Sequence, residues 1–149
     1  GTTTSAGLRN LSALPAGWRY EGWVGLPIIE IHNGKLAAFQ YVSTGKFLRA
    51  DSADFDGAGP GRGPGLGYNF PGQDFISAPG NLVKPDLRAF MSMITIEPEP
   101  DNSPRPFSLR LLSIPLPSTP LPRGQALQMD NVAATSLPRA KITVVRSGY

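Results

Sequence analysis

The chain has 149 residues, with 14 Lys or Arg against 11 Asp or Glu and a net charge of +3. This length suits one domain with its own core, and the absence of cysteine excludes disulfides, thiolate metal sites and thiol catalysis. The basic residues are scattered, so they do not favour nucleic acid as a partner, and no run of about 18 apolar residues predicts a membrane span.

Apolar residues recur with period two along most of the chain, which is typical of strands, and no window shows a convincing apolar stripe at helical spacing. Seven or eight short strands separated by Gly/Pro turns predict an all-β domain, an immunoglobulin-like sandwich of antiparallel strands spanning residues 1–149. Residues 1–5 are expected to be disordered. The predicted strands lie at 6–12, 17–25, 28–32, 35–42, 88–97, 106–113, 124–129 and 139–146.

Three aromatic residues mark the strand at 17–25. Strand alternation places Tyr20 and Trp23 on opposite faces, unless Gly22 hosts a bulge. We expect Trp23 to be buried in the core, while Trp18 is also a candidate for a recognition surface.

Asn33-Gly34 is the strongest local signal in the chain, because this pair readily takes the positive φ angles of a type I′ turn. It predicts a tight antiparallel hairpin between residues 28–32 and 35–42. Farther along, the strand at 88–97 is apolar on both sides, so we expect it to be central and covered.

Residues 51–86 hold much of the chain's glycine and are predicted to form one long loop. Tyr68, Phe70 and Phe75 within it supply apolar surface that is costly to leave in water. Two interpretations remain open. Either these aromatic residues dock the loop onto the sandwich, or they form a recognition surface together with Trp18.

Candidate chemistry is sparse. Asp51, Asp54 and Asp56 suggest a calcium loop, but their spacing does not fit an EF-hand and Asp is an ordinary loop residue. Glu97 and Glu99 could be imagined as an acid pair, yet a strand end followed by a Pro-rich turn favours a structural role. The sequence therefore predicts no catalytic residue, no cofactor, and at most a weak metal site.

Three segments taken in order resemble the extracytoplasmic C-terminal domain of anti-sigma-K factors and their secreted or lipoprotein relatives. The segments are 14–23, with Tyr-Glu-Gly-Trp; 43–47, with Ser-Thr-Gly-Lys-Phe; and 96–104, with Ile-Glu-Pro-Glu-Pro. The ordered match that they define covers about half of the chain. The positions that match the family pattern are Tyr20, Trp23, Ser43, Gly45, Phe47, Glu97 and Pro98.

The resemblance implies a small all-β module outside the cytoplasmic membrane, with a structural role for the matched residues. The chain departs from the family pattern at the hairpin around Asn33-Gly34 and at the long loop. The start at Gly1 favours a mature N-terminus, with a lipid anchor possible upstream. We therefore expect a non-catalytic bacterial module that senses the envelope or binds an envelope component or protein. The alternative is an exported carbohydrate-binding or hydrolase domain.

Overall fold

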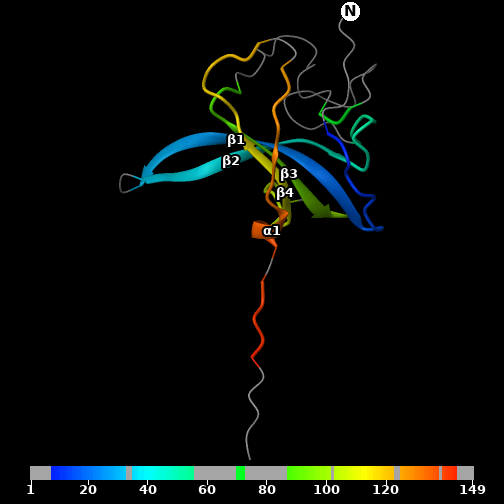
Figure 1. Ribbon diagram of the computed structural model, residues 1–149. Helices are drawn as coiled ribbons and strands as arrows, with labels where there is room; N and C mark the ends of the chain where they lie inside the picture. The colour runs from blue at the N-terminus through cyan, green and yellow to red at the C-terminus, as the bar shows by residue number, and fades with distance from the viewer. Residues whose placement is uncertain are drawn as a thin grey trace, which may run out of the picture.

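The computed structural model describes residues 8–32, 35–55, 70–72, 87–101, 103–122, 125–137 and 139–143. Within them the chain forms an antiparallel sheet of five strands in the order β2-β1-β3-β4-β5, together with one turn of helix (Figure 1). The all-β prediction is therefore confirmed. The elements are β1 Trp18–His32, β2 Lys35–Phe47, β3 Met91–Pro98, β4 Arg110–Pro115, β5 Asp130–Asn131 and α1 Ala133–Ser136.

The predicted hairpin is confirmed as an antiparallel pair, and it is longer than expected. The strands predicted at 17–25 and 28–32 are one continuous strand, β1, which pairs with β2 from Tyr20 to His32. His32 lies opposite Lys35. The connecting pair Asn33-Gly34 lies outside the described residues, so the type I′ turn stays a prediction.

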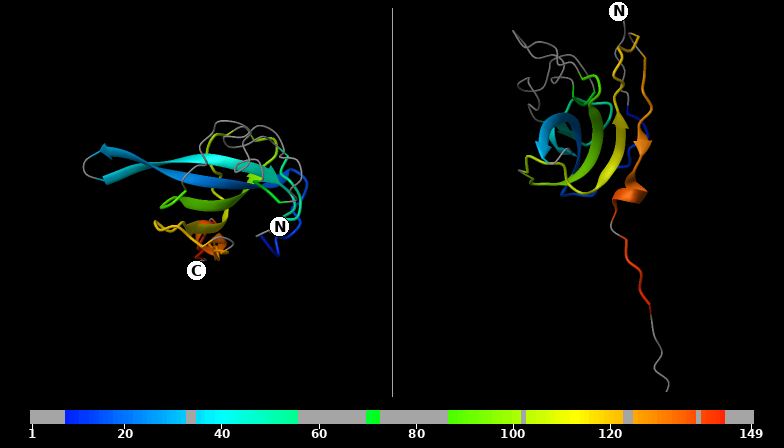
Figure 2. Two further views of the ribbon diagram at one scale, coloured as in Figure 1. Left: turned by 90° about the horizontal axis from the view of Figure 1, so that it is seen from above. Right: turned by 90° about the vertical axis from the view of Figure 1, so that its left-hand side faces the viewer.

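Beyond Gly25 the hairpin leaves the sheet. The pairing of β1 with β3 ends where Gly25 meets Met91, whereas its pairing with β2 continues to the end of the strand. Residues 26–32 and 35–40 thus form a two-stranded ribbon that projects past β3 and β4 (Figures 1 and 2). We call this segment the ribbon.

One face of the sheet carries an apolar core. Tyr20, Phe47 and Ile94 are buried together, and the Tyr20 and Phe47 rings stack with centroids 5.6 Å apart. The N-terminal segment covers them, and the Tyr20 hydroxyl donates to the Ser12 carbonyl at 2.7 Å. The partly buried residues packed against this cluster are Leu8, Leu11, Leu14, Ile96, Leu111, Leu112 and Met129.

The opposite face is different in character. Trp23 lies opposite Met93 in the register of β1 with β3, so it points away from Tyr20, as alternation predicts. Trp23 is 2% exposed, which confirms that it is buried. A register shift between Gly22 and Trp23 occurs on the side of β2 only. The predicted central strand is also confirmed, because β3 lies between β1 and β4 with Met93 and Ile94 buried.

Two predicted strands are wrong in the residues that the structure describes. Residues 8–12 form no strand, because Asn10 has a φ of 58°. Leu8, Leu11 and Leu14, which are spaced three residues apart, all pack on the same apolar cluster. Residues 139–143 also form no strand and are exposed. The strand expected at 124–129 lies slightly later in the chain. Among the described residues, the two that pair with β4 are Asp130 and Asn131.

Candidate functional site: a buried carboxylate cluster

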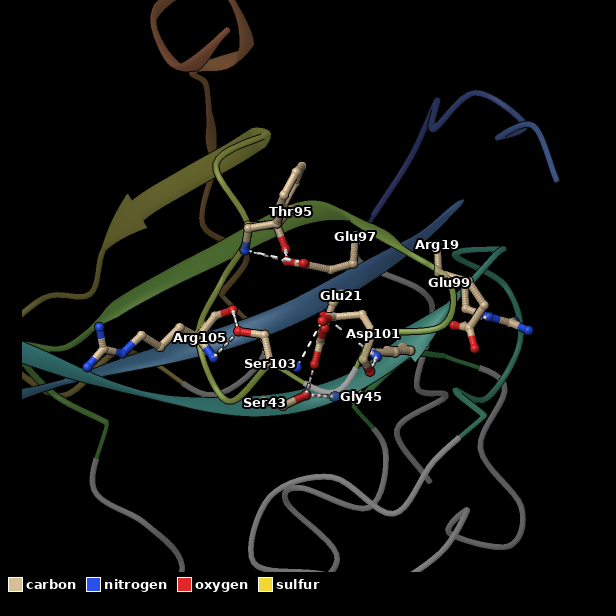
Figure 3. Close-up of polar contacts among 12 residues, drawn as sticks. Arg19, Glu21, Ser43, Gly45, Thr95, Glu97, Glu99, Asp101, Ser103 and Arg105 are labelled. Carbon is tan, nitrogen blue, oxygen red and sulfur yellow. Dashed lines mark hydrogen bonds and ion pairs between the residues drawn. The ribbon is translucent and has the colours of Figure 1, made fainter. Parts of the chain in front are cut away.

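Charged side chains gather at the middle of the sheet, on the face that carries Trp23. Glu21 of β1 lies opposite Lys46 of β2 and opposite Thr95 of β3, so the registers place these three side chains on one face. Glu97 follows on β3, and Asp101 comes from the loop that leaves β3 (Figure 3). We call Glu21, Lys46, Glu97 and Asp101 the carboxylate cluster.

Glu97 is the most enclosed member, with 1% of its surface exposed. Its Oε1 accepts the Phe107 backbone N–H at 2.9 Å and a very short hydrogen bond from the Thr95 hydroxyl. The indole Nε1 of Trp23 donates to that same Thr95 hydroxyl at 2.9 Å. A chain of hydrogen bonds therefore links β1 and β3 to the segment that precedes β4.

Hydrogen bonds of Glu21 and Lys46 connect β1, β2 and the loop after β3. The Ser43 hydroxyl donates to Glu21 Oε1 at 2.5 Å, and the Gly45 N–H donates to the same hydroxyl at 3.2 Å. Lys46 Nζ donates to the Asp101 carbonyl at 2.7 Å and lies 3.9 Å from Asp101 Oδ2. The ammonium thus anchors residue 101 over the sheet.

Burial dominates the electrostatics of Glu97. Removal of this carboxyl from water raises its pKa above 4.5, and the Asp101 charge raises it further. The hydrogen bonds from Thr95 and Phe107 act in the opposite direction without cancelling that effect. Three carboxyl groups and one ammonium share this site, so a proton on Glu97 reduces the repulsion among them.

The cluster also has the spacing of a cation site. Glu21, Glu97 and Asp101 each offer a carboxylate oxygen, and these oxygens lie within 4.8 Å of one another. Oxygen donors of this kind suit hard divalent cations. Yet each carboxylate already accepts hydrogen bonds from the chain, since Glu97 binds Phe107, Glu21 binds Ser43, and Asp101 Oδ1 accepts the Ser103 N–H at 2.8 Å. These hydrogen bonds hold the strands and the loop together, which is a structural role.

Trp18 and Arg19 are neighbours at the start of β1, and their side chains contact different residues. Trp18 packs against Phe107 with ring centroids 6.2 Å apart. Arg19, its neighbour, places its guanidinium 4.5 Å from the centroid of the exposed Phe55 ring and donates from Nε to Glu99 at 2.8 Å. Glu99 is therefore a surface partner of Arg19, while Glu97 lies inside.

The calcium candidates do not share a site in the described residues. Asp51 is exposed and forms a bidentate pair with Arg49 at 2.8 Å, and these hydrogen bonds lower the pKa of Asp51. Asp54 is buried instead, where its Oδ2 accepts the Gly72 N–H at 2.7 Å. Asp56 lies outside the described residues.

The loop aromatics are described only in part. Phe70 is half-buried, next to the point where Gly72 meets Asp54, whereas Tyr68 and Phe75 lie outside the described residues. The docking of the loop by all three rings therefore stays a prediction.

The sequence motifs contain most of the site without revealing it. Of the residues that are hydrogen-bonded in the site, Trp23, Ser43, Gly45 and Glu97 are motif positions. Glu21 and Lys46 lie inside two of the motif segments without being motif positions. One signal was available: Glu21 and Trp23 have the same strand parity, so a charged residue must share a face with a buried indole. Asp101 carries no such signal, because the path of a loop decides its position.

Comparisons with known proteins add no relative to this description. Searches against protein-family models, curated proteins and solved structures each found no match. In the part of the chain that the structure describes, no helix has the length and apolar character needed to cross a membrane.

Proposed function

We propose that this chain is a non-catalytic, extracytoplasmic β-module that binds a partner protein or an envelope component through the ribbon. The resemblance to the anti-sigma-K extracytoplasmic domain supports the location and the immunoglobulin-like sandwich expected for the complete fold. The ribbon supports the activity. Sensing of the envelope would follow from occupancy of the ribbon by its partner.

The observation that carries the proposal is the end of β3 pairing at Gly25. Past this point two strands continue with no third strand beside them among the described residues, although a hairpin alone is marginally stable in water. Its sequence is mostly apolar, with Leu-Pro-Ile-Ile on one strand and Leu-Ala-Ala-Phe on the other. Such a segment gains most from a partner surface that covers it.

The burial and hydrogen bonding of the carboxylate cluster support a non-catalytic role. A general acid needs to reach a substrate, but Glu97 is 1% exposed and its oxygens bind Thr95 and Phe107 of the same chain. Its hydrogen bonds connect strands to a loop, which is the work of a structural network.

A shortened hairpin tests the proposal. Residues 28–38 are replaced by Asn-Gly so that the turn closes soon after the last contact with β3. We expect the variant to keep the melting temperature of the parent within a few degrees and to lose binding to bacterial envelope fractions. Binding that survives the shortening would contradict the proposal. Reporter fusions to the full gene test the location.

One observation favours the alternative of a carbohydrate-binding domain. Trp18 and Phe107 form a tilted aromatic pair, and Phe107 is 39% exposed. Sugar rings stack on such surfaces. Titration of oligosaccharides against Trp fluorescence, with Phe107→Ala as the matched variant, tests this alternative, and saturable quenching that is lost in the variant would support it.

A further inference from the structure

β2 is an outer strand of the sheet and has a long open edge. In the described part of the chain it pairs with β1 alone. Near its end this edge is occupied, since the Lys46 carbonyl accepts the Phe55 N–H at 2.9 Å. Farther out, along residues 35–40 of the ribbon, the described chain places no strand beside it. We call the outer side of residues 35–40 the ribbon edge.

Backbone groups alternate along β1 between its two neighbouring strands. The Glu99 N–H, directly after β3, donates to the carbonyl of Gly17, directly before β1, at 2.8 Å. The pairing of β1 with β3 then runs without a register shift up to Gly25. Odd-numbered residues of β1 therefore face β3, and even-numbered residues face β2. Pro27 follows this order, so its nitrogen, which has no hydrogen to donate, lies on the side beyond the end of β3.

The same alternation determines which backbone groups of β2 reach the ribbon edge. The residues of β2 opposite the even-numbered positions 26 and 28 are Gln40 and Ala38. The N–H and C=O groups of Gln40 and Ala38 therefore point to β1. Those of Ala37 and Phe39, which alternate with them, point away from β1. A strand that lay alongside the ribbon edge could therefore form hydrogen bonds with Ala37 and Phe39.

The two edges of the ribbon differ in how they are protected against a further strand. The edge on β1 carries Pro27 and a register shift between Ile28 and Ile31, and both features hinder strand addition. The ribbon edge on β2 has no proline, and its one charged residue is Lys35. Natural sheets protect the strand edges that must stay unpaired. The unprotected edge therefore indicates where a strand is added.

We propose that two copies of this chain pair antiparallel through their ribbon edges, about a two-fold axis at Ala38. The ribbon projects past β3 and β4, so two ribbons can lie side by side while the rest of each sheet stays apart (Figures 1 and 2). The pair forms a four-stranded sheet, in which each hairpin gains the neighbour that a hairpin alone lacks. This proposal does not rest on the proposed function, because strand pairing uses the backbone of β2 and leaves the faces of the ribbon uncovered.

One register matches the outward-pointing groups of the two copies. With Ala38 on the axis, Ala37 of each copy lies opposite Phe39 of the other, and both residues present outward N–H and C=O groups. The pair on the axis then consists of two small residues, and the large Phe39 lies opposite a small residue. A slip by one residue would set Phe39 opposite Ala38, whose backbone groups point to β1.

Proline at an outward-pointing position tests the pairing. We expect sedimentation equilibrium of the parent chain to give a dimer with a dissociation constant of about 1 to 100 µM. Ala37→Pro removes an N–H that β1 does not use, so it should raise this constant by more than about tenfold while the melting temperature stays within a few degrees. Ala37→Ser keeps the N–H and should change the constant by less than about threefold. A parent chain that is monomeric up to about 1 mM, or an Ala37→Pro variant that dimerises as the parent does, would overturn the proposal.

Cysteine variants test the register. The parent chain has no cysteine, and Cα atoms of a non-hydrogen-bonded antiparallel pair lie about 4.5 Å apart, which is within disulfide reach. Ala38→Cys should therefore form a disulfide-linked dimer on mild oxidation. Gln40→Cys is the matched control on the same strand, because in this register it lies opposite position 36 and not opposite itself, and it should stay unlinked. An Ala38→Cys variant that links no faster than Gln40→Cys would overturn the proposal.

Discussion

Trp23 combines a buried ring with a hydrogen bond, because its indole N–H donates to the Thr95 hydroxyl. Trp23→Ala should cost about 3 to 5 kcal/mol of unfolding free energy through lost burial and a cavity. Trp23→Phe keeps most of the ring volume and removes the hydrogen bond, so it should cost about 1 to 2 kcal/mol. Urea denaturation measures both, and equal losses in the two variants would contradict the separation of packing from hydrogen bonding.

Glu97 gives the fold a pH dependence of defined sign. Since its pKa is raised in the folded state, its contribution to stability is fully present below about pH 4.5 and is lost as the pH rises through the folded pKa. Glu97→Gln accepts the same N–H bond without titrating. We therefore expect the variant to gain stability relative to the parent as the pH rises from about 4.5 through the folded pKa of Glu97.

Urea midpoints measured across that range check this expectation. Glu99→Gln, which removes a surface carboxylate two residues away, controls for the change in net charge. If the difference in unfolding free energy between Glu97→Gln and the parent stays constant with pH, Glu97 is not the group responsible.

At the level of elements, Gly45 allows Asp54, from the loop after β2, to pack closely against that strand. Its φ is +118°, and a Cβ placed there would lie 2.5 Å from the Asp54 carboxyl carbon. Gly17 has a φ of +85° with nothing within 4 Å of such a Cβ. Both alanine substitutions strain the backbone, but only Gly45→Ala also overlaps Asp54.

Gly45→Ala should therefore destabilise the fold by about 2 kcal/mol more than Gly17→Ala does. Thermal and urea unfolding of the two variants provide the comparison. Equal losses would mean that the Asp54 carboxyl can move aside without cost.

The elements that could be predicted from sequence are those set by local patterns. Period two identified β1 to β4, and the Asn-Gly pair identified the hairpin, because these signals depend on neighbouring residues. The carboxylate cluster was not predicted, since Asp101 reaches Lys46 only through the path of a loop. The segment at 139–143 has a strand pattern without a strand, because pairing requires a neighbour that the pattern does not supply.

For the molecule as a whole, the sheet has a well-paired centre and a ribbon paired on one side. Residues 20–25 of β1 lie between β2 and β3, whereas residues 26–32 have β2 alone among the described strands. Hydrogen exchange should therefore be slowest in the first stretch and faster in the second. Equal protection of both stretches in the isolated chain would contradict this ranking.

The contacts of Asp54 also have a practical consequence for engineering. The Phe55 N–H donates to the Lys46 carbonyl at 2.9 Å, and Asp54 binds Gly72, so the two ends of the segment 56–69 are tied to one place on β2. An excursion whose ends are fixed together can change length at little entropic cost. A reporter peptide or a small folded domain inserted between residues 60 and 64 should therefore leave the thermal midpoint within a few degrees of the parent, which differential scanning calorimetry can measure. This position would allow the protein to be labelled while both strand termini and the ribbon stay unaltered.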